Sequence, residues 1–169
     1  GPNLEMKRTV SSTLSSSKIK IIDEIRNIGN ERSPHMFLYH INLGWPLVDE
    51  GAEIIWQGKW KSRGTKNDTL VYKKKNDIKT CSPIKEKHAG PGESVFFIDP
   101  EKNEDGWCLC GVHNARAPLA LFIYFKKGQL PCLTNWQHWG KREYVTALEP
   151  GTNWPIGQSK ARYSNTLNF

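Results

Sequence analysis

Hydrophobic residues in this chain alternate with polar ones far more often than they recur with a helical period. In residues 17–28 (SKIKIIDEIRNI), Ile19, Ile21 and Ile25 fall on one side of an extended chain and charged side chains fall on the other. A period of two predicts a half-buried strand over this segment. Residues 4–10 form a second strand-like segment just before it.

Short apolar runs bounded by turn residues fill most of the remaining chain. They predict strands at residues 36–40, 53–61, 95–98, 107–112, 119–125, 130–139 and 144–148, with a further short strand near 70–72. The polar stretch 62–91 predicts long loops, and Gly140-Lys141-Arg142 predicts a hairpin connection. Many short strands with frequent turns indicate an all-β, mostly antiparallel sandwich or barrel.

The length of 169 residues fits one domain, residues 1–169. A strand-like segment lies almost at the start of the chain, and an apolar strand begins at residues 166–169. A sandwich cut at these points would leave exposed sheet edges. We therefore expect this single domain to be part of a larger sandwich, incomplete at both ends.

Composition and charge narrow the classes of partner. Hydrophobic residues make up 37% and charged residues 24%, an ordinary globular balance, and no apolar run is long enough to span a bilayer. The net charge of +7 raises the possibility of nucleic acid, but the lysines are spread over predicted loops rather than a stripe with interleaved aromatics. We interpret them as solvated surface, whose basic field also attracts anionic sugars. A basic, nucleic-acid-associated β-protein is the minor alternative.

Four cysteines, Cys81, Cys108, Cys110 and Cys132, show no disulfide-framework spacing, and no export signal precedes them. Reduced thiols and a cytoplasmic location are the expectation. Cys108 and Cys110 share one face of a predicted strand, and His113 lies nearby, which leaves a metal site as an alternative. The spacing is not that of common zinc motifs, so small buried core residues are the preferred interpretation.

Two segments carry candidate chemistry: LYHINLGWP, with His40, and YVTALEPGTNWPIG, with Glu149. Each places one proton-transfer group where a predicted strand meets a Gly/Pro turn. A histidine titrates near neutrality, and an acid and a base on opposite sides of a substrate can exchange protons with it. The plain alternatives are a structural histidine and a glutamate that binds turn amides.

These segments resemble the aldose 1-epimerase (galactose mutarotase) family, especially a divergent, uncharacterised branch. YHINLGWPL is similar to a family segment in which a histidine precedes an asparagine-containing apolar turn, here His40 and Asn42. LEPGTNWP matches a Leu-Glu-Pro segment followed by Asn-x-Pro, and LPCLTNWQHWGKREYVTALEP is similar as well. The resemblance covers most of the chain and corresponds to roughly the C-terminal half of such a protein.

The resemblance implies a galactose-mutarotase-like antiparallel β-sandwich that interconverts sugar anomers without a cofactor. Glu149 would take the proton of the anomeric hydroxyl, and His40 would protonate the ring oxygen. We expect the two side chains to face each other across a sugar-sized hollow. A further histidine and an arginine that such proteins use to hold the sugar have no match before His40. The rival interpretation is a noncatalytic sugar-binding module of the same fold.

Six further residues are candidate sugar contacts. Aromatic faces suit the C–H faces of sugar rings, although packing in the core is the common role of a tryptophan. His113 and Arg116 follow a predicted strand and could reach the cleft, and Asn153 could bind a sugar hydroxyl or close its own turn. The expected partner is a small-molecule sugar, with neither nucleic acid nor membrane. The proposed contacts are Asn42, His113, Arg116, Trp136, Asn153 and Trp154.

Overall fold

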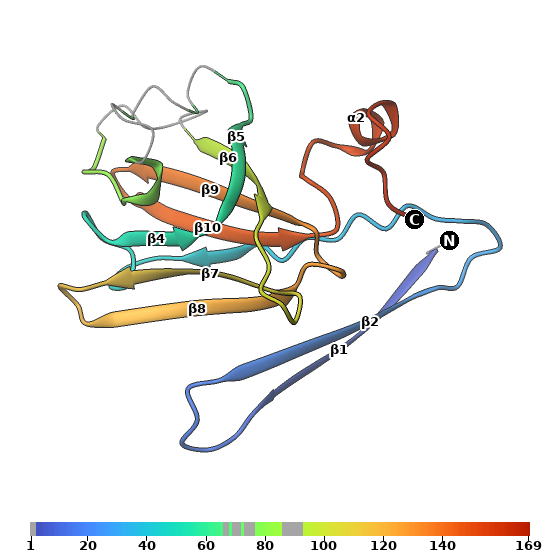
Figure 1. Ribbon diagram of the computed structural model, residues 1–169, viewed down its shortest axis with the longest axis horizontal. Coiled ribbons are helices and arrows are strands. Elements are labelled where there is room, and N and C mark those ends of the chain that lie inside the picture. Colours follow the sequence, from blue (N-terminus) through green and yellow to red (C-terminus); the bar gives the residue numbers. More distant parts are fainter. Residues whose placement is uncertain (1–2, 66–67, 69–71, 73–76, 86–92) are drawn as a thin grey trace.

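Two antiparallel sheets and a separate hairpin make up the computed structural model of the chain (Figure 1), which describes residues 3–65, 68, 72, 77–85 and 93–169. The larger sheet has the strand order β3-β10-β9-β6-β5, the smaller sheet β4-β7-β8, and the hairpin pairs β1 with β2. The antiparallel all-β sandwich is therefore confirmed.

The elements follow one another along the chain as hairpins and sheet crossovers. Their bounds are β1 (Leu4–Ser12), β2 (Ile19–Asn27), β3 (Ile41–Leu43), β4 (Glu53–Trp56), β5 (Gly58–Ser62), η1 (Asp77–Lys79), β6 (Ser94–Pro100), β7 (Trp107–Asn114), β8 (Leu119–Lys126), β9 (Cys132–Gly140), β10 (Glu143–Gly151) and α2 (Gln158–Tyr163).

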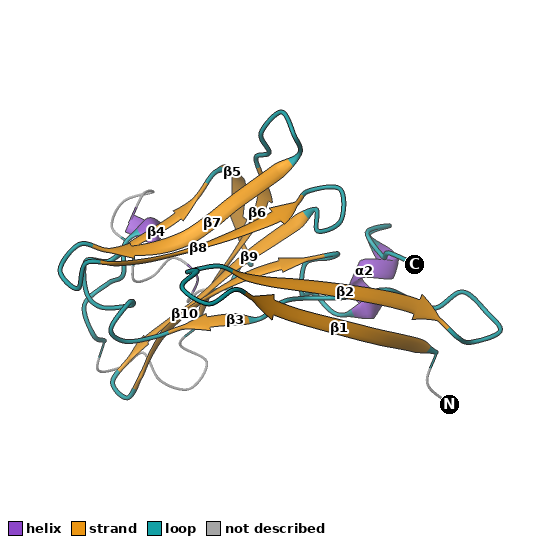
Figure 2. Ribbon diagram, turned by 90° about the horizontal axis from the view of Figure 1, so that it is seen from below, coloured by secondary structure: helices purple, strands orange, loops and turns teal. Residues whose placement is uncertain are grey.

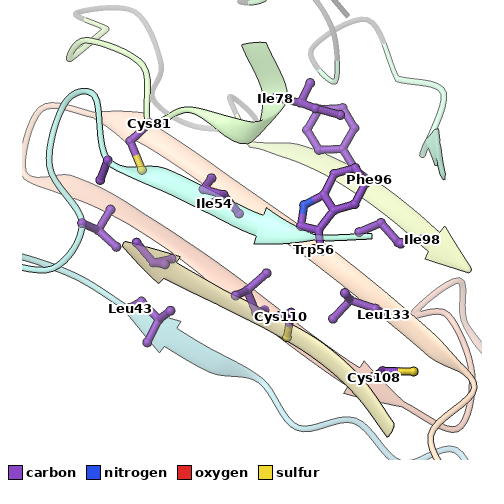
Figure 3. Close-up of a cluster of buried hydrophobic side chains, with 14 of the residues drawn as sticks. Leu43, Ile54, Trp56, Ile78, Cys81, Phe96, Ile98, Cys108, Cys110 and Leu133 are labelled. Carbon is purple, nitrogen blue, oxygen red and sulfur yellow. The ribbon is translucent and has the colours of Figure 1, made fainter. Parts of the chain in front are cut away.

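The hydrophobic core lies between the two sheets, and alternate residues of each strand point into it (Figure 3). Phe96 and Ile98 of β6 face Trp56 of β4, and Cys108 and Cys110 of β7 pack in the same cluster. The interpretation of Cys108 and Cys110 as buried core residues is confirmed. Because side chains alternate along a strand, the intervening residues of β6, β9 and β10 lie on the opposite, outer face of the larger sheet.

The segment 53–61 does not form the single strand that its pattern predicts. It contains β4 and β5, which belong to different sheets. The chain crosses between them at Gly58, whose φ of +135° is a conformation that other residues rarely adopt. A Cβ at this position would lie 2.1 Å from the carbonyl oxygen of Asp99, so only glycine fits the close approach of β5 to β6.

The β1–β2 hairpin extends away from the two packed sheets (Figures 1 and 2). Its strands are as predicted, but the half-buried state expected for 17–28 is wrong, because Ile19 is 72% exposed and Val10 of the facing strand 60%. The hydroxyl of Tyr39 donates a 2.5 Å hydrogen bond to Asp23, which also pairs with Arg8 at 2.7 Å. These polar contacts connect the middle of the hairpin to the segment that precedes β3.

The remaining strand predictions agree with the structure to within a few residues, with one shift and one omission. The strand expected at 36–40 is represented by an isolated bridge between Leu38 and Gly151, and the regular strand begins at Ile41. The sequence pattern gave no sign of α2, and most of the strand expected near 70–72 lies outside the described residues. In the described part of the chain, no helix combines the length and apolar character needed to cross a membrane.

Candidate functional site

The pairing register of β3 and β10 brings His40 and Glu149 together. Ile41 pairs with Leu148, and the backbone N–H of Tyr39 donates to the carbonyl of Pro150 at 3.0 Å, so His40 lies directly opposite Glu149. Cross-strand neighbours project from the same face of a sheet. The His40 Nε2 and Glu149 Oε1 atoms are 2.9 Å apart, on the outer face of the larger sheet.

The two side chains differ sharply in their surroundings. The side chain of Glu149 is only 3% exposed, whereas that of His40 is 49% exposed. Burial raises the pKa of Glu149 to about 7, with a smaller contribution from the negative charge of Glu93. Although Nε2 lies close, no group among the described residues makes an aligned hydrogen bond to Glu149 Oε1. A carboxyl group in this state can both hold and release a proton near neutral pH.

Trp136 forms one wall beside this pair. It lies on β9 opposite Ala147, so it shares the outer face with Glu149 two residues further along β10. Its ring centroid lies 6.1 Å from that of His40, and its indole N–H donates to Glu93 Oε2 at 2.6 Å. Glu93 is in turn paired with Arg63 at 2.5 Å. These contacts fix the plane of the indole ring next to the imidazole.

Asn42 and Trp154 lie on the same face of the sheet. Asn42 pairs with Ala147 across β3 and β10, two residues from His40 along one side of the strand. Trp154 stacks on Phe97 of β6, with ring centroids 5.9 Å apart and planes inclined by 30°. Three of the predicted contacts, Asn42, Trp136 and Trp154, therefore share the outer face with the His40–Glu149 pair.

His113 and Arg116 are not part of this site, and the expectation that they reach it is wrong. His113 lies on β7 between core-facing Val112 and Asn114, so it projects from the outside of the smaller sheet, where its Nδ1 lies 3.7 Å from Glu53. Arg116 belongs to the β7–β8 turn and lies 3.5 Å from Asp49. The alternation of side chains along a strand explains the error for His113. Cys108 and Cys110 point into the core, so His113, an odd number of positions away on the same strand, points outward.

Asn153 serves the local chain rather than an open cleft. Its side chain is buried, its amide donates to the carbonyl of Thr166, and its Oδ1 accepts from the hydroxyl of Thr152. Neither of the two roles open from the sequence matches these contacts: the Asn153 side chain holds the C-terminal segment at Thr166 and contacts the hydroxyl of the neighbouring Thr152.

The expected hollow between His40 and Glu149 is also absent, because the 2.9 Å contact leaves no space for a sugar between the two groups. A ligand must lie over the pair or replace their mutual contact. The half-exposed imidazole can turn toward it, whereas the carboxyl is held by its buried strand.

Sequence reasoning missed several residues of this face, including Glu93, Arg63 and Thr134. The signal for β5 was present, since GKWKSR places Lys59, Lys61 and Arg63 at every second position. The sequence around Glu93 does not indicate its role, because that role depends on Trp136, which comes from a strand far along the chain.

The cysteine–histidine alternative for a metal is not supported by the arrangement of the side chains. Cys108 and Cys110 point into the core, and His113 points to the outside of the same sheet. Within the ranges that the structure describes, no three histidine, cysteine, aspartate or glutamate side chains gather as metal ligands.

Comparisons with known proteins identify the fold. A crystal structure of a putative aldose 1-epimerase from Klebsiella pneumoniae subsp. pneumoniae is similar, with a TM-score of 0.86 at 22% sequence identity. The match covers 98% of this chain but 42% of the other, so the chain spans less than half the length of that protein. It supports an aldose 1-epimerase-like β-sandwich. A comparison with curated proteins gave no match.

The family comparison gives a match along the full length of the chain. The model of the family described as "Domain of unknown function (DUF4432)" matches residues 1–169. The chain therefore belongs to the DUF4432 family.

Proposed function

We propose that the outer face of the larger sheet binds an aldose and interconverts its anomers through Glu149 and His40. The observation that carries this proposal is the 2.9 Å approach of His40 Nε2 to Glu149 Oε1, on one face and beside the indole of Trp136. Two proton-transfer groups with different exposure stand where a ring could contact both. The likeness to a putative aldose 1-epimerase in fold is consistent with this chemistry.

The reaction requires one proton to leave the sugar and another to reach it. The ionised carboxylate of Glu149 takes the proton of the anomeric hydroxyl while the C1–O5 bond breaks and its electron pair moves to the ring oxygen. The imidazolium of His40 donates a proton to that oxygen. The open-chain aldehyde turns about its C1–C2 bond, and reclosure with both transfers reversed gives the other anomer.

The protein environment suits Glu149 to the role of base. Its pKa of about 7 keeps an appreciable fraction ionised at neutral pH and makes the carboxylate a stronger base than a solvated glutamate. His40 is exposed enough to approach the ring oxygen without reorganising the strand. Trp136 offers an aromatic surface beside the pair, with its ring centroid 6.1 Å from that of His40.

Anomer exchange measured by NMR on a panel of aldoses tests the proposal. Glu149→Gln and His40→Ala are each expected to reduce the protein-catalysed rate about 10²–10⁴-fold. The matched controls are Glu53→Gln and His113→Ala, which alter the other histidine–glutamate pair, on the outside of the smaller sheet, and are expected to leave the rate unchanged.

The noncatalytic sugar-binding module predicts a different result. Aldoses would bind, no exchange would be accelerated, and neither substitution at the pair would change a rate. That outcome would overturn the proposed activity while leaving the sugar-binding role of this face in place.

A further inference from the structure

One straight row of side chains crosses the outer face from the proposed catalytic pair to the opposite edge of the larger sheet. Glu149 of β10 pairs with Thr134 of β9, Thr134 with Phe97 of β6, and Phe97 with Lys61 of β5. Adjacent strands lie about 4.8 Å apart, so β10 and β5 are separated by about 14 Å. This distance exceeds what a single bound pyranose ring would cover.

The middle of the row is aromatic and contains polar atoms without partners. Trp154 stacks on Phe97, and the Nζ atom of Lys61 lies 5.0 Å from the centre of the Trp154 ring. Thr134 is 1% exposed, and its hydroxyl has no hydrogen-bond partner among the described residues; the same holds for the buried indole N–H of Trp154. Buried polar groups are normally satisfied, so these two groups are unusual, and a ligand that supplies the missing bonds must displace the side chains that cover them.

The far end of the row is basic. Lys59, Lys61 and Arg63 follow one another at every second position of β5 and its end, and so face the same side as Glu149. Arg63 is engaged by Glu93 and Asp68. Across the described part of the chain, neither Lys59 nor Lys61 forms an ion pair, so their positive charge is available to a ligand.

We propose, building on the proposed function, that this row binds an aldose phosphate. Its anomeric end lies at Glu149 and His40, its ring and hydroxyls lie along Thr134 and Trp154, and its phosphate group pairs with Lys61. A phosphate ester fits the distance between Glu149 and Lys61 better than a uronate does. The ester adds the C–O–P bonds, so its charge lies further from the ring than that of a carboxylate attached directly to the ring. Lysine is a common partner of phosphate oxygens.

Binding of matched ligands to the full chain tests the inference. Calorimetric titration would compare each neutral aldose with its terminal phosphate in the glucose, galactose and ribose series, and with the uronate in the two hexose series. At least one phosphate is expected to bind about tenfold or more tightly than its neutral parent, which is the effect of one charge-assisted hydrogen bond. Its affinity is expected to fall as salt increases.

Substitutions at Lys61 attribute that preference to the residue. Lys61→Gln is expected to bring the ratio of phosphate affinity to neutral-sugar affinity close to one, and Lys61→Arg is expected to preserve the preference for the phosphate. Lys20→Gln, on the charged face of the hairpin, removes the same charge far from the site and is expected to change nothing. Because Lys61 is exposed, thermal melting of these variants is expected to match the original protein.

The results separate this inference from the proposed function. The phosphate subsite would be overturned if neutral and phosphorylated sugars bound equally, if the uronates bound more tightly, or if none of the phosphates bound. Equal effects of Lys61→Gln and Lys20→Gln would also overturn it. Lys61-dependent phosphate binding without accelerated anomer exchange would overturn the proposed activity and support the phosphate subsite. Accelerated exchange of neutral sugars with no role for Lys61 would support the proposed activity and overturn the phosphate subsite.

Discussion

The indole N–H of Trp136 donates a 2.6 Å hydrogen bond to Glu93, and this bond connects the wall of the candidate site to the charge that acts on Glu149. Glu93 thereby has two effects. It holds the indole ring beside His40, and its negative charge disfavours ionisation of the nearby carboxyl group.

Glu93→Gln separates these effects, because the glutamine oxygen can still accept the indole hydrogen bond. Loss of the negative charge is expected to lower the pKa of Glu149 from about 7 toward its ordinary value. If Glu149 is the base, the acidic limb of the pH–rate profile for anomer exchange moves to lower pH. Glu104→Gln, in an exposed loop, is the charge-matched control. An unchanged acidic limb in Glu93→Gln would show that the charge of Glu93 does not affect the pKa of the base.

The raised pKa of Glu149 also makes the stability of the protein depend on pH. The folded chain holds this proton more tightly than the unfolded chain, whose glutamate titrates near 4.5. The free energy of unfolding is therefore expected to fall as pH rises from about 4.5 to about 7, by up to about 3 kcal/mol.

Urea unfolding at pH 4.5 and pH 7.5 measures this dependence. Glu149→Gln, which cannot ionise, is expected to show a smaller loss of stability between the two pH values than the original protein. Glu24→Gln on the exposed hairpin should behave like the original protein. Parallel pH dependence in all three proteins would mean that Glu149 ionises as easily in the folded chain as in the unfolded one.

Gly58→Ala is expected to destabilise the protein by about 2–4 kcal/mol, because it combines a φ of +135° with a Cβ placed 2.1 Å from the Asp99 carbonyl oxygen. Gly128→Ala, where a Cβ would meet nothing within 4 Å, is expected to change stability by less than about 0.5 kcal/mol. Thermal or urea unfolding distinguishes the two. Similar midpoints for both variants would show that β5 can relax away from β6.

The exposed apolar face of the β1–β2 hairpin is expected to promote self-association of the 169-residue chain. Val10 and Ile21 face each other across the hairpin on this side, and they are 60% and 45% exposed. The double substitution Val10→Thr and Ile21→Thr keeps the preference for strand structure and is expected to shift the chain toward monomer in sedimentation velocity.

Ile22→Thr is the matched control for the hairpin, because Ile22 lies on the opposite, charged face next to Lys20 and Glu24. It is expected to have a smaller effect than the double substitution. Equal sedimentation of all variants at every concentration would show that this face does not mediate association.

Much of the sheet structure was predictable because it is encoded locally. The apolar runs of β6 to β10 and the Gly140-Lys141-Arg142 turn appear directly in the sequence. The division of 53–61 between two sheets was not predictable, since it depends on where β6 lies relative to Gly58. The exposure of Ile19 has a similar cause: alternation shows that a face is apolar, not that another element covers it.

The candidate site shows the same limit. His40 and Glu149 were identified from their motifs, and the register that places them opposite each other follows from the folded sheet. The assignment of His113 to the site was wrong, because Cys110 and Val112 point into the core and the alternation of side chains along β7 turns His113 outward. Glu93 and Thr134 depend on cross-strand neighbours and have no local signal.

Core and site residues alternate along the same strands, for example Leu148 and Glu149 on β10 and Leu133 and Thr134 on β9. If the outer face binds a sugar as proposed, single substitutions at the outward positions can change ligand preference while the packed interior stays intact. A one-residue insertion or deletion within either strand would instead turn core residues outward and site residues inward, and so damage the core and the site at once. In the history of such a sheet, strand length should change far less readily than the identity of every second residue.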